Sequence, residues 1–258
     1  MTGLPGGSAA SADENRPAPN TAAGTTTAKT DTDPATRELL GVLLALTLLS
    51  GMVDAVCYLG LGHVFTANMT GNVVILGFAA AGAPGFSVTA SLTSLLVFLV
   101  GAVCGGRISK HVPRRSRQLT AGVALEAIFV AAAAVVAFAA SSVSAGWARY
   151  TTIALLAFAM GIRNAVIRRL AVPDMTTTVL TLTLTGLAAD SSLAGGRNPH
   201  VGRRLGAVLT MLIGAVVGAS LFLHQGAALP LGISAAAAAV TAVAAYAGRS
   251  AAYLDKRG

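Results

Sequence analysis

An acidic residue, Asp54, lies inside a long apolar stretch of this chain, where an ionised group is costly. At a rise of about 1.5 Å per residue, it would lie roughly 5 Å past the middle of a helix formed by that stretch. Thr47, Ser50 and Tyr58 recur with it at helical spacing, so the four side chains form one polar stripe that faces the bundle interior. Because burying such an acid costs at least about 2.5 kcal/mol, we expect Asp54 to bind a solute or carry a coupling proton. A hydrogen-bonded structural acid near the interface is the alternative.

The same pattern occurs a second time, later in the chain. Gly51–Ala55 recurs as Gly161–Ala165, which places Asn164 at the position of Asp54 and Arg163 directly before it. Arg163 can pair with Asp54 across an axis that relates the two copies, or its side chain can extend to the inner membrane surface. We expect the second arrangement.

Two further acids lie in or beside apolar stretches. Glu126 is either a second buried acid or a partner for the basic segment 107–117. Asp190 either caps the end of its own segment or pairs with Arg197.

Two short stretches combine polar side chains with an apolar continuation. Asn68, Thr70, Gly71 and Asn72 precede Val73–Ala81, which is typical of a half-helix that begins at membrane depth. At the matching place in the second copy stand Thr177, Thr178 and Thr181. Two half-helix N-termini would present positive dipole ends and free N–H groups to an anionic or polar solute. Alternatively, the threonines bond their own helix backbone and merely bend it.

The sequence contains no pattern typical of an enzyme. The four histidines lie apart on loops and helix ends without ligand spacing, at His63, His111, His200 and His224. No phosphate-binding glycine loop follows a strand, and no nucleophile stands with a base. We therefore expect no catalytic residue, no metal, no cofactor and no enzymatic activity. Cys57 and Cys104 lie in apolar segments, where we expect them to be packing residues.

The composition places the chain in a lipid bilayer. Hydrophobic residues make up 54% of its 258 residues and charged residues 11%, well below the roughly 25% usual in soluble domains. Six apolar runs reach the roughly 20 residues that span a bilayer. They are Leu39–Leu61, Phe86–Gly106, Leu119–Ala140, Ala148–Leu170, Leu205–Leu223 and Leu229–Ala247. Thr66–Ala81 and Thr176–Ala189 are shorter or more polar. The net charge of +8 lies beside these runs, which indicates membrane lipids and not nucleic acid as partners.

The positions of the basic residues predict the topology. Lys and Arg gather at 107–117, 163–169, 197–204 and 249–257. Loops rich in these residues remain in the cytoplasm. All four clusters lie inside when the six long runs span fully and each short stretch enters and leaves by the same face. We therefore expect an all-α polytopic membrane protein with six transmembrane helices plus two re-entrant or broken helices, and both termini in the cytoplasm.

Three motifs recur in the same order and predict an internal repeat. Besides Gly51–Ala55, Gly77–Ala80 recurs as Gly186–Ala189 and Leu99–Gly105 as Leu212–Gly218. Because equivalent ends differ in charge, the two copies lie inverted in the membrane. We expect a disordered cytoplasmic tail (1–36), a first repeat (37–140), a second repeat (141–248) and a short basic tail (249–258). Gly101-x-x-x-Gly105 and Gly214-x-x-x-Gly218 favour close helix packing, within the chain or in a homodimer.

The chain resembles the YoaK family, a group of uncharacterised bacterial inner-membrane proteins. The resemblance rests on Gly51-x-x-Asp54-Ala, on Asn68-Met-Thr-Gly-Asn72, and on Gly161-x-Arg163-Asn164-Ala with Thr177-Thr178-Val-Leu-Thr181. It runs from about Leu39 to Gly248, and it implies about six spans and a location in the bacterial cytoplasmic membrane. It implies no particular solute.

These observations favour a secondary transporter of a small polar or anionic solute, coupled to protons through Asp54. A passive small-solute channel of hourglass type is the runner-up, in which Asp54 orients a segment without titrating. A membrane scaffold that transports nothing is the third hypothesis.

Overall fold

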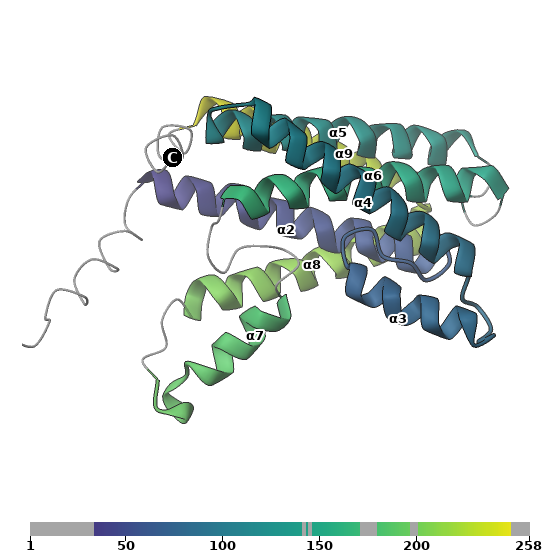
Figure 1. The fold of residues 1–258 in the computed structure, drawn as a ribbon, viewed down its shortest axis with the longest axis horizontal. Helices are drawn as coiled ribbons and strands as arrows, with labels where there is room; N and C mark the ends of the chain where they lie inside the picture. Colours follow the sequence, from purple (N-terminus) through teal and green to yellow (C-terminus); the bar gives the residue numbers. More distant parts are fainter. Residues whose placement is uncertain (1–33, 141–142, 144–145, 171–179, 197–200, 249–258) are drawn as a thin grey trace, which may run out of the picture. The chain divides into compact units, whose positions relative to one another are not determined.

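The computed structural model describes residues 34–140, 143, 146–170, 180–196 and 201–248. Over these residues the chain is helical and contains no strand (Figure 1). In chain order, the helices are α2 (Pro34–Gly60), α3 (Met69–Ala80), α4 (Val88–His111), α5 (Arg115–Ala139), α6 (Gly146–Leu170), α7 (Leu180–Ala189), the short 3₁₀ turn η2 (Ser192–Ala194), α8 (Val201–Gln225) and α9 (Ala228–Ala247).

Six of these helices, α2, α4, α5, α6, α8 and α9, are long and apolar enough to cross a bilayer. This confirms the predicted all-α polytopic fold. Polar residues continue the helices beyond the apolar runs, so α4 ends at His111 and α5 begins at Arg115. α2 begins at Pro34, inside the segment predicted as a disordered tail, because proline is tolerated in the first turn of a helix. Residues 1–33 and 249–258 lie outside the described residues.

The long helices pack in a regular pattern of pairs. α4 lies along α6 and α2 along α8, while α5 contacts α6 and α9, and α9 also contacts α2. In Figure 1, α2, α5 and α8 run in one direction and α4, α6 and α9 in the other. Two hydrophobic clusters, contributed mainly by α2, α5, α6 and α9, form the core. Asp54, Glu126 and Arg163 lie on three of these four helices, α2, α5 and α6.

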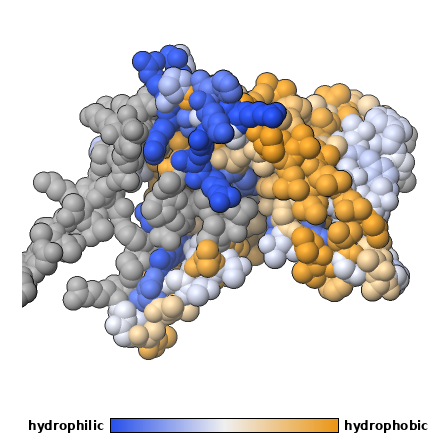
Figure 2. Space-filling view, in the orientation of Figure 1, coloured by the Kyte–Doolittle hydropathy of each residue, from blue (hydrophilic) through white to orange (hydrophobic). Residues whose placement is uncertain are grey.

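The outward faces of α4 and α8 are apolar. Figure 2 shows hydrophobic residues over much of the visible surface and hydrophilic residues gathered toward one end. Of the six long helices, α8 is the least buried. Its exposed large apolar residues are Leu205, Leu209, Leu212, Ile213, Val216, Val217 and Leu223. Such a surface is suited to contact with lipid acyl chains and not with water.

Glycines bring α2 and α8 into close contact. A Cβ at Gly51 would overlap the carbonyl oxygen of Met211, and one at Gly214 would overlap the carbonyl oxygen of Leu48. A Cβ at Gly218 would lie 2.6 Å from the Cα of Met52.

α4 and α6 approach each other in the same way. A Cβ at Gly101 would overlap the carbonyl oxygen of Phe158, and one at Gly161 would overlap that of Phe98. The small-residue spacing found in the sequence thus serves packing inside the chain.

Two short helices interrupt the series of long ones. α3 connects α2 to α4 and packs on α4, and α7 precedes α8 and packs on α8. In Figure 1, α3 lies near the end of α2 and the start of α4, whereas α7 lies near the start of α8, at the other end of the long helices. α3 occupies most of the predicted short stretch Thr66–Ala81. Of the second stretch, Leu180–Ala189 is helical, and 176–179 lie outside the described residues.

Candidate functional site

The chain turns back into the helix bundle directly after α2. Although α2 ends at Gly60, the backbone N–H groups of Thr66 and Ala67 donate to Oδ1 of Asp54, at N···O distances of 3.2 and 3.4 Å. Asp54 is 6% exposed and lies about 9 Å inside the end of α2, at 1.5 Å per residue. A buried carboxylate inside an apolar helix therefore accepts hydrogen bonds from non-helical backbone N–H groups.

Asn72 holds residues 61–68 from the side of α3, and we call these residues the re-entrant segment because their backbone turns back to Asp54. Its Nδ2 donates to the carbonyl oxygen of Phe65 at 2.6 Å and to Oγ of Ser94 at 3.1 Å. Its Oδ1 accepts from the N–H of Phe65 at 2.8 Å, and Oγ of Ser94 donates to the Phe65 carbonyl at 2.6 Å. Both polar backbone groups of Phe65 are thus bonded to buried side chains from α3 and α4.

The remaining predicted residues of this segment lie at the start of α3. Asn68 is the N-cap of the helix, and its Oδ1 accepts from the N–H of Gly71 at 3.3 Å. A Cβ at Gly71 would lie 2.9 Å from the ring of Phe65, so the helix start packs closely on the segment. The side chains of Asn68 and Thr70 are exposed.

Aromatic and basic residues hold the outer part of the segment. Tyr58 is half-buried and stacks on Phe65, with 5.1 Å between ring centroids. Nε of Arg149, from the start of α6, donates to the carbonyl oxygen of Leu61 at 2.8 Å. His63 has a positive φ of 59° and its Nδ1 lies 3.0 Å from the carbonyl oxygen of Gly85. The segment is therefore bonded to α2, α3, α4, α6 and the turn before α4.

Arg163 takes neither of the positions considered for it. It is 1% exposed, so its side chain does not extend to the membrane surface, and its partner is Glu126 and not Asp54. Nη1 of Arg163 lies 2.7 Å from Oε1 of Glu126, and Glu126 is also 1% exposed. Glu126 is thus a buried acid, on α5, and does not contact the basic segment 107–117. The predicted extension of Arg163 to the membrane surface is therefore wrong. The physical reason is that a buried counter-ion, Glu126, stabilises the guanidinium away from water.

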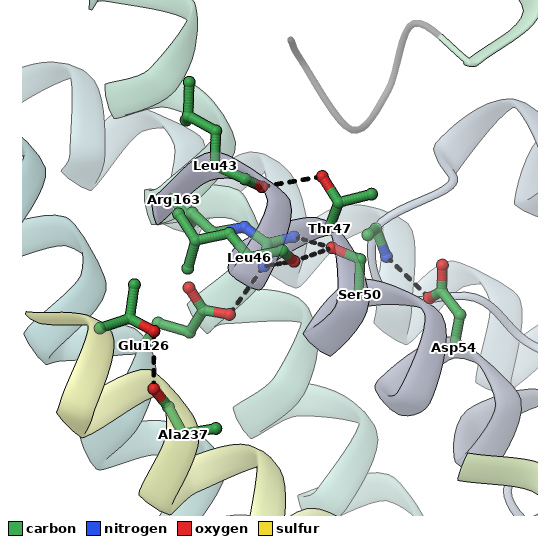
Figure 3. Close-up of polar contacts among 10 residues, drawn as sticks. Leu43, Leu46, Thr47, Ser50, Asp54, Glu126, Arg163 and Ala237 are labelled. Atoms are coloured by element: carbon green, nitrogen blue, oxygen red, sulfur yellow. Dashed lines mark hydrogen bonds and ion pairs between the residues drawn. The ribbon is translucent and has the colours of Figure 1, made fainter. Parts of the chain in front are cut away.

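The polar stripe on α2 is divided between these two sites. Figure 3 shows Ser50 beside Arg163. Asp54 lies farther from Arg163 than Ser50 does, on the side of the re-entrant segment. Nη2 of Arg163 donates to Oγ of Ser50 at 2.5 Å, and Nη1 also donates to the carbonyl oxygen of Leu46 at 3.3 Å. Thr47 is buried, and its hydroxyl donates to its own helix. Three of the four predicted stripe residues are therefore buried, and Tyr58 is half-buried.

The second short segment is less fully described. Thr177 and Thr178 lie outside the described residues, and Thr181 is exposed on α7. Asn164 is half-buried on α6, one residue after Arg163. Asp190 pairs with Arg204 of α8 at 2.7 Å, and Nη1 of Arg204 also donates to the carbonyl oxygen of Gly186 at 2.8 Å.

No group of three or more His, Cys, Asp and Glu side chains able to hold a metal ion occurs among the described residues. Cys57 is buried, with Sγ 3.7 Å from Oγ1 of Thr66, and Cys104 is half-buried.

Sequence reasoning missed Ser94, Arg149 and the partner of Arg163. Ser94 and Arg149 had no distinguishing spacing, since each acts on backbone carbonyls far away in the sequence. The Arg163–Glu126 pair had a signal, because an intramembrane base needs an acid and Glu126 is the acid nearest the middle of a long apolar run other than Asp54.

Comparisons with known proteins identify a matching family and a similar membrane protein. The family described as "Protein of unknown function (DUF1275)" matches residues 42–244. The chain is 36% identical over 167 residues to "UPF0700 transmembrane protein YoaK" of Bacillus subtilis (strain 168), which covers 62% of this chain and 70% of that protein. No solved structure matches. Together with six helices able to span a bilayer, these matches show that the chain is a multi-pass integral membrane protein that belongs to the DUF1275 family and is similar to YoaK.

Proposed function

We propose that this protein is a secondary transporter of a small polar or anionic solute, with the re-entrant segment and α3 beside the solute path. The observation that carries this proposal is the buried Asp54 carboxylate bonded to the backbone of Thr66 and Ala67. Interrupted helices at membrane depth form the solute and ion sites of many secondary transporters. A merely structural membrane protein has no need of an unwound segment in its core, because a continuous helix satisfies its own backbone.

The helix contacts support an inverted repeat with copies at 37–140 and 141–248. Exchanging α2 with α6, α3 with α7, α4 with α8 and α5 with α9 converts the α2–α8 contact into the α6–α4 contact. The same exchange converts α5–α6 into α9–α2 and α3–α4 into α7–α8. The long helices exchanged in this way run in opposite directions in Figure 1. Such a repeat provides two related arrangements, and alternating access follows from rocking between them.

The residues at the start of α3 support a polar or anionic solute. The N-terminus of a helix carries a partial positive charge and free N–H groups. The exposed side chains of Asn68 and Thr70 add hydrogen-bonding groups at the same place. A solute with oxygen acceptors is suited to this environment.

Asp54 has a positioning role in this proposal. Backbone N–H groups form stronger hydrogen bonds to an ionised carboxylate than to a neutral carboxyl group, and Asp54 accepts two such bonds, from Thr66 and Ala67. Protonation would weaken both bonds and loosen the segment. This is the route by which Asp54 itself would couple transport to protons, as expected from the sequence.

A passive channel is the second candidate, and one observation favours it. The re-entrant segment is bonded to four helices, which suits a fixed pore lining better than a moving gate. In a channel, Asp54 only orients the segment and flux does not saturate with solute concentration.

The distribution of charge supports a location in the bacterial cytoplasmic membrane with both termini in the cytoplasm. The turn between α4 and α5 lies among Lys110, Arg114, Arg115 and Arg117, whereas the turn between α8 and α9 contains no Lys or Arg. Basic loops remain on the cytoplasmic side.

The proposal is tested in liposomes loaded with a pH-sensitive dye and exposed to pooled small anions and polar metabolites. Wild type and Ser234→Ala should show saturable solute-driven proton movement, and Asp54→Ala should lose it. Ser234 is a suitable control because its buried hydroxyl bonds only its own helix, at Pro230. Solute-dependent swelling without saturation or proton movement would support the channel, and absence of any solute movement would contradict both.

Asp54→Asn separates positioning from proton coupling. The amide keeps an acceptor oxygen for the segment but cannot titrate. Solute and proton movement that stay coupled in this variant, whatever their rate, support positioning, whereas solute exchange that persists without proton movement would assign the coupling proton to Asp54.

A further inference from the structure

The Arg163–Glu126 pair lies in the helix core, and the hydrogen bonds of Arg163 go to Leu46, Ser50 and Glu126 and not to the re-entrant segment. Glu126 is near the middle of α5, and Ser50, which also contacts Arg163, is near the middle of α2. The two core clusters flank the pair, one containing Leu46 and the other Met160. Since charge this deep in a membrane is costly, a paired acid and base there indicate a functional site.

The pair retains unused hydrogen-bonding capacity. Among the described residues, Oε2 of Glu126 and Nε of Arg163 are buried and have no hydrogen-bond partner. A guanidinium forms a fork that binds a carboxylate through two parallel bonds, yet Glu126 receives only one bond from Arg163. Arg163 is therefore positioned to bind a carboxylate more completely than it binds Glu126.

We propose that a small monocarboxylate replaces Glu126 on Arg163 during transport, and that Glu126 takes up a proton as it is displaced. This names the solute class of the proposed transporter and rests on that function. The proton comes from a hydronium ion of the bulk solvent: one O–H bond of hydronium breaks, a new O–H bond forms on a carboxylate oxygen of Glu126, and a neutral water molecule is left. The site then holds cationic Arg163, one solute anion and neutral Glu126, so its net charge remains zero.

Charge conservation explains both the coupling and the choice of solute. Without protonation, the solute would leave a net negative charge buried among apolar helices, which is expensive. A doubly charged solute would leave the same excess charge even after Glu126 is protonated. The site therefore selects a singly charged carboxylate, together with one proton.

Glu126 is the proton acceptor of this site because the helices packed against α5 place no other acid beside Arg163. α6 contributes Arg163, and α9, which also packs on α5, contains no Asp, Glu, Lys, Arg or His. The charged residues of α4 lie in its last turns, beside the start of α5. On α2, Ser50 contacts Arg163, and Asp54 is bonded to the re-entrant segment.

The first experiment tests whether an external carboxylate reaches Arg163. In Glu126→Ala, formate and acetate should raise the lowered Tm of the purified protein, because they replace the missing carboxylate. The same salts should leave the Tm of Glu126→Ala/Arg163→Met unchanged, which controls for general salt effects. If formate and acetate shift both variants equally, the anion site is overturned.

The second experiment detects the proton on the wild-type protein. Infrared difference spectra on perfusion with acetate, lactate or pyruvate should show a new band of a protonated carboxylic acid. Glu126→Gln should lose this band, and Ser234→Ala should retain it. A wild-type spectrum without the band for all three solutes, or an unchanged band in Glu126→Gln, overturns proton uptake by Glu126.

Neither experiment measures transport, so the two proposals can fail separately. Rescue and a carboxylic acid band in a protein that moves no solute would leave the anion site and overturn the transporter. Saturable transport without the Tm rescue and without the carboxylic acid band would leave the transporter and overturn the anion site.

Discussion

Asp54 and Glu126 are both buried acids of the membrane core, but their carboxylates are held by different groups. Asp54 accepts from two backbone N–H groups, whereas Glu126 pairs with a side chain, Arg163. A backbone donor is fixed by the course of the chain, but a side-chain partner can be exchanged by rotation of a few bonds. We therefore assign positioning to Asp54 and solute exchange to the Glu126 pair.

Removing the Asp54 carboxylate should release the re-entrant segment. Hydrogen bonds to charged groups contribute about 1.5–3 kcal/mol, so in Asp54→Ala amide exchange around Thr66 and Ala67 should be at least about tenfold faster. Hydrogen exchange followed by mass spectrometry measures this in the purified protein. Ser234→Ala should leave exchange in that peptide unchanged, and an unchanged rate in Asp54→Ala would show that other contacts hold the segment.

Breaking the Arg163–Glu126 pair should cost far more than replacing it. Loss of one partner leaves a buried charge, which typically costs about 3–5 kcal/mol, whereas a hydrophobic pair of similar volume is often neutral. We expect Arg163→Met to be strongly destabilised and Arg163→Met/Glu126→Leu to be close to wild type in stability. Unfolding in mixed micelles measures both. If the double variant loses as much unfolding free energy as Arg163→Met and Glu126→Leu lose together, the two residues do not act as a pair.

At the scale of single residues, the sequence identifies the polar residues that are costly to bury in a membrane, but it does not identify their hydrogen-bond partners. Asp54, Asn72 and Arg163 stand out because polar groups are rare in apolar runs. The bonds of Asp54 to Thr66 and Ala67 depend on the path of the loop, and the pairing of Arg163 depends on how α5 and α6 are rotated. No local pattern specifies either, so the predicted extension of Arg163 to the membrane surface was wrong.

The helices themselves show how small residues set the packing of the elements. Gly51 and Gly214 lie where α2 and α8 meet, and Gly101 and Gly161 lie where α4 and α6 meet. These contacts lie between helices that the proposal assigns to different copies. They are therefore the surfaces across which a rocking motion must pass.

A methyl group at Gly214 should destabilise the protein, because it would overlap the carbonyl oxygen of Leu48. Overpacking typically costs about 1–3 kcal/mol, which should lower the Tm of Gly214→Ala clearly. A Cβ at Gly206, on the same helix, would meet no atom within 4 Å, so Gly206→Ala is the matched control. Equal Tm values for the two variants would contradict the close contact of α2 with α8.

The long helices could be predicted from hydropathy, while their ends could not. Apolar runs identify all six spans, yet α4 and α5 extend into the basic segment 107–117, since helical hydrogen bonding does not stop where lipid contact stops. The short segment at Thr66–Ala81 was predicted to be broken on the basis of capping and glycine residues, and α3 starts there at Met69.

For the whole molecule, the inverted repeat predicts that the two short segments open to opposite sides of the membrane. In a Cys57→Ala/Cys104→Ala background, Pro84→Cys and Gln225→Cys should react with an impermeant maleimide in intact cells. Leu193→Cys and Arg114→Cys should react only after permeabilisation. All four positions are exposed at the surface of the protein, so access depends on the side of the membrane. Identical behaviour of Pro84→Cys and Leu193→Cys would contradict the inverted arrangement.

Counterflow in liposomes tests most directly whether the protein is a transporter. Liposomes are loaded with a high concentration of the solute that gives proton movement, diluted into a trace of the labelled solute, and followed over time. An alternating-access carrier should accumulate label transiently above its equilibrium level, and Asp54→Ala should not. If the labelled solute only equilibrates in wild-type liposomes, with no overshoot, the protein behaves as a channel and is not an alternating-access carrier.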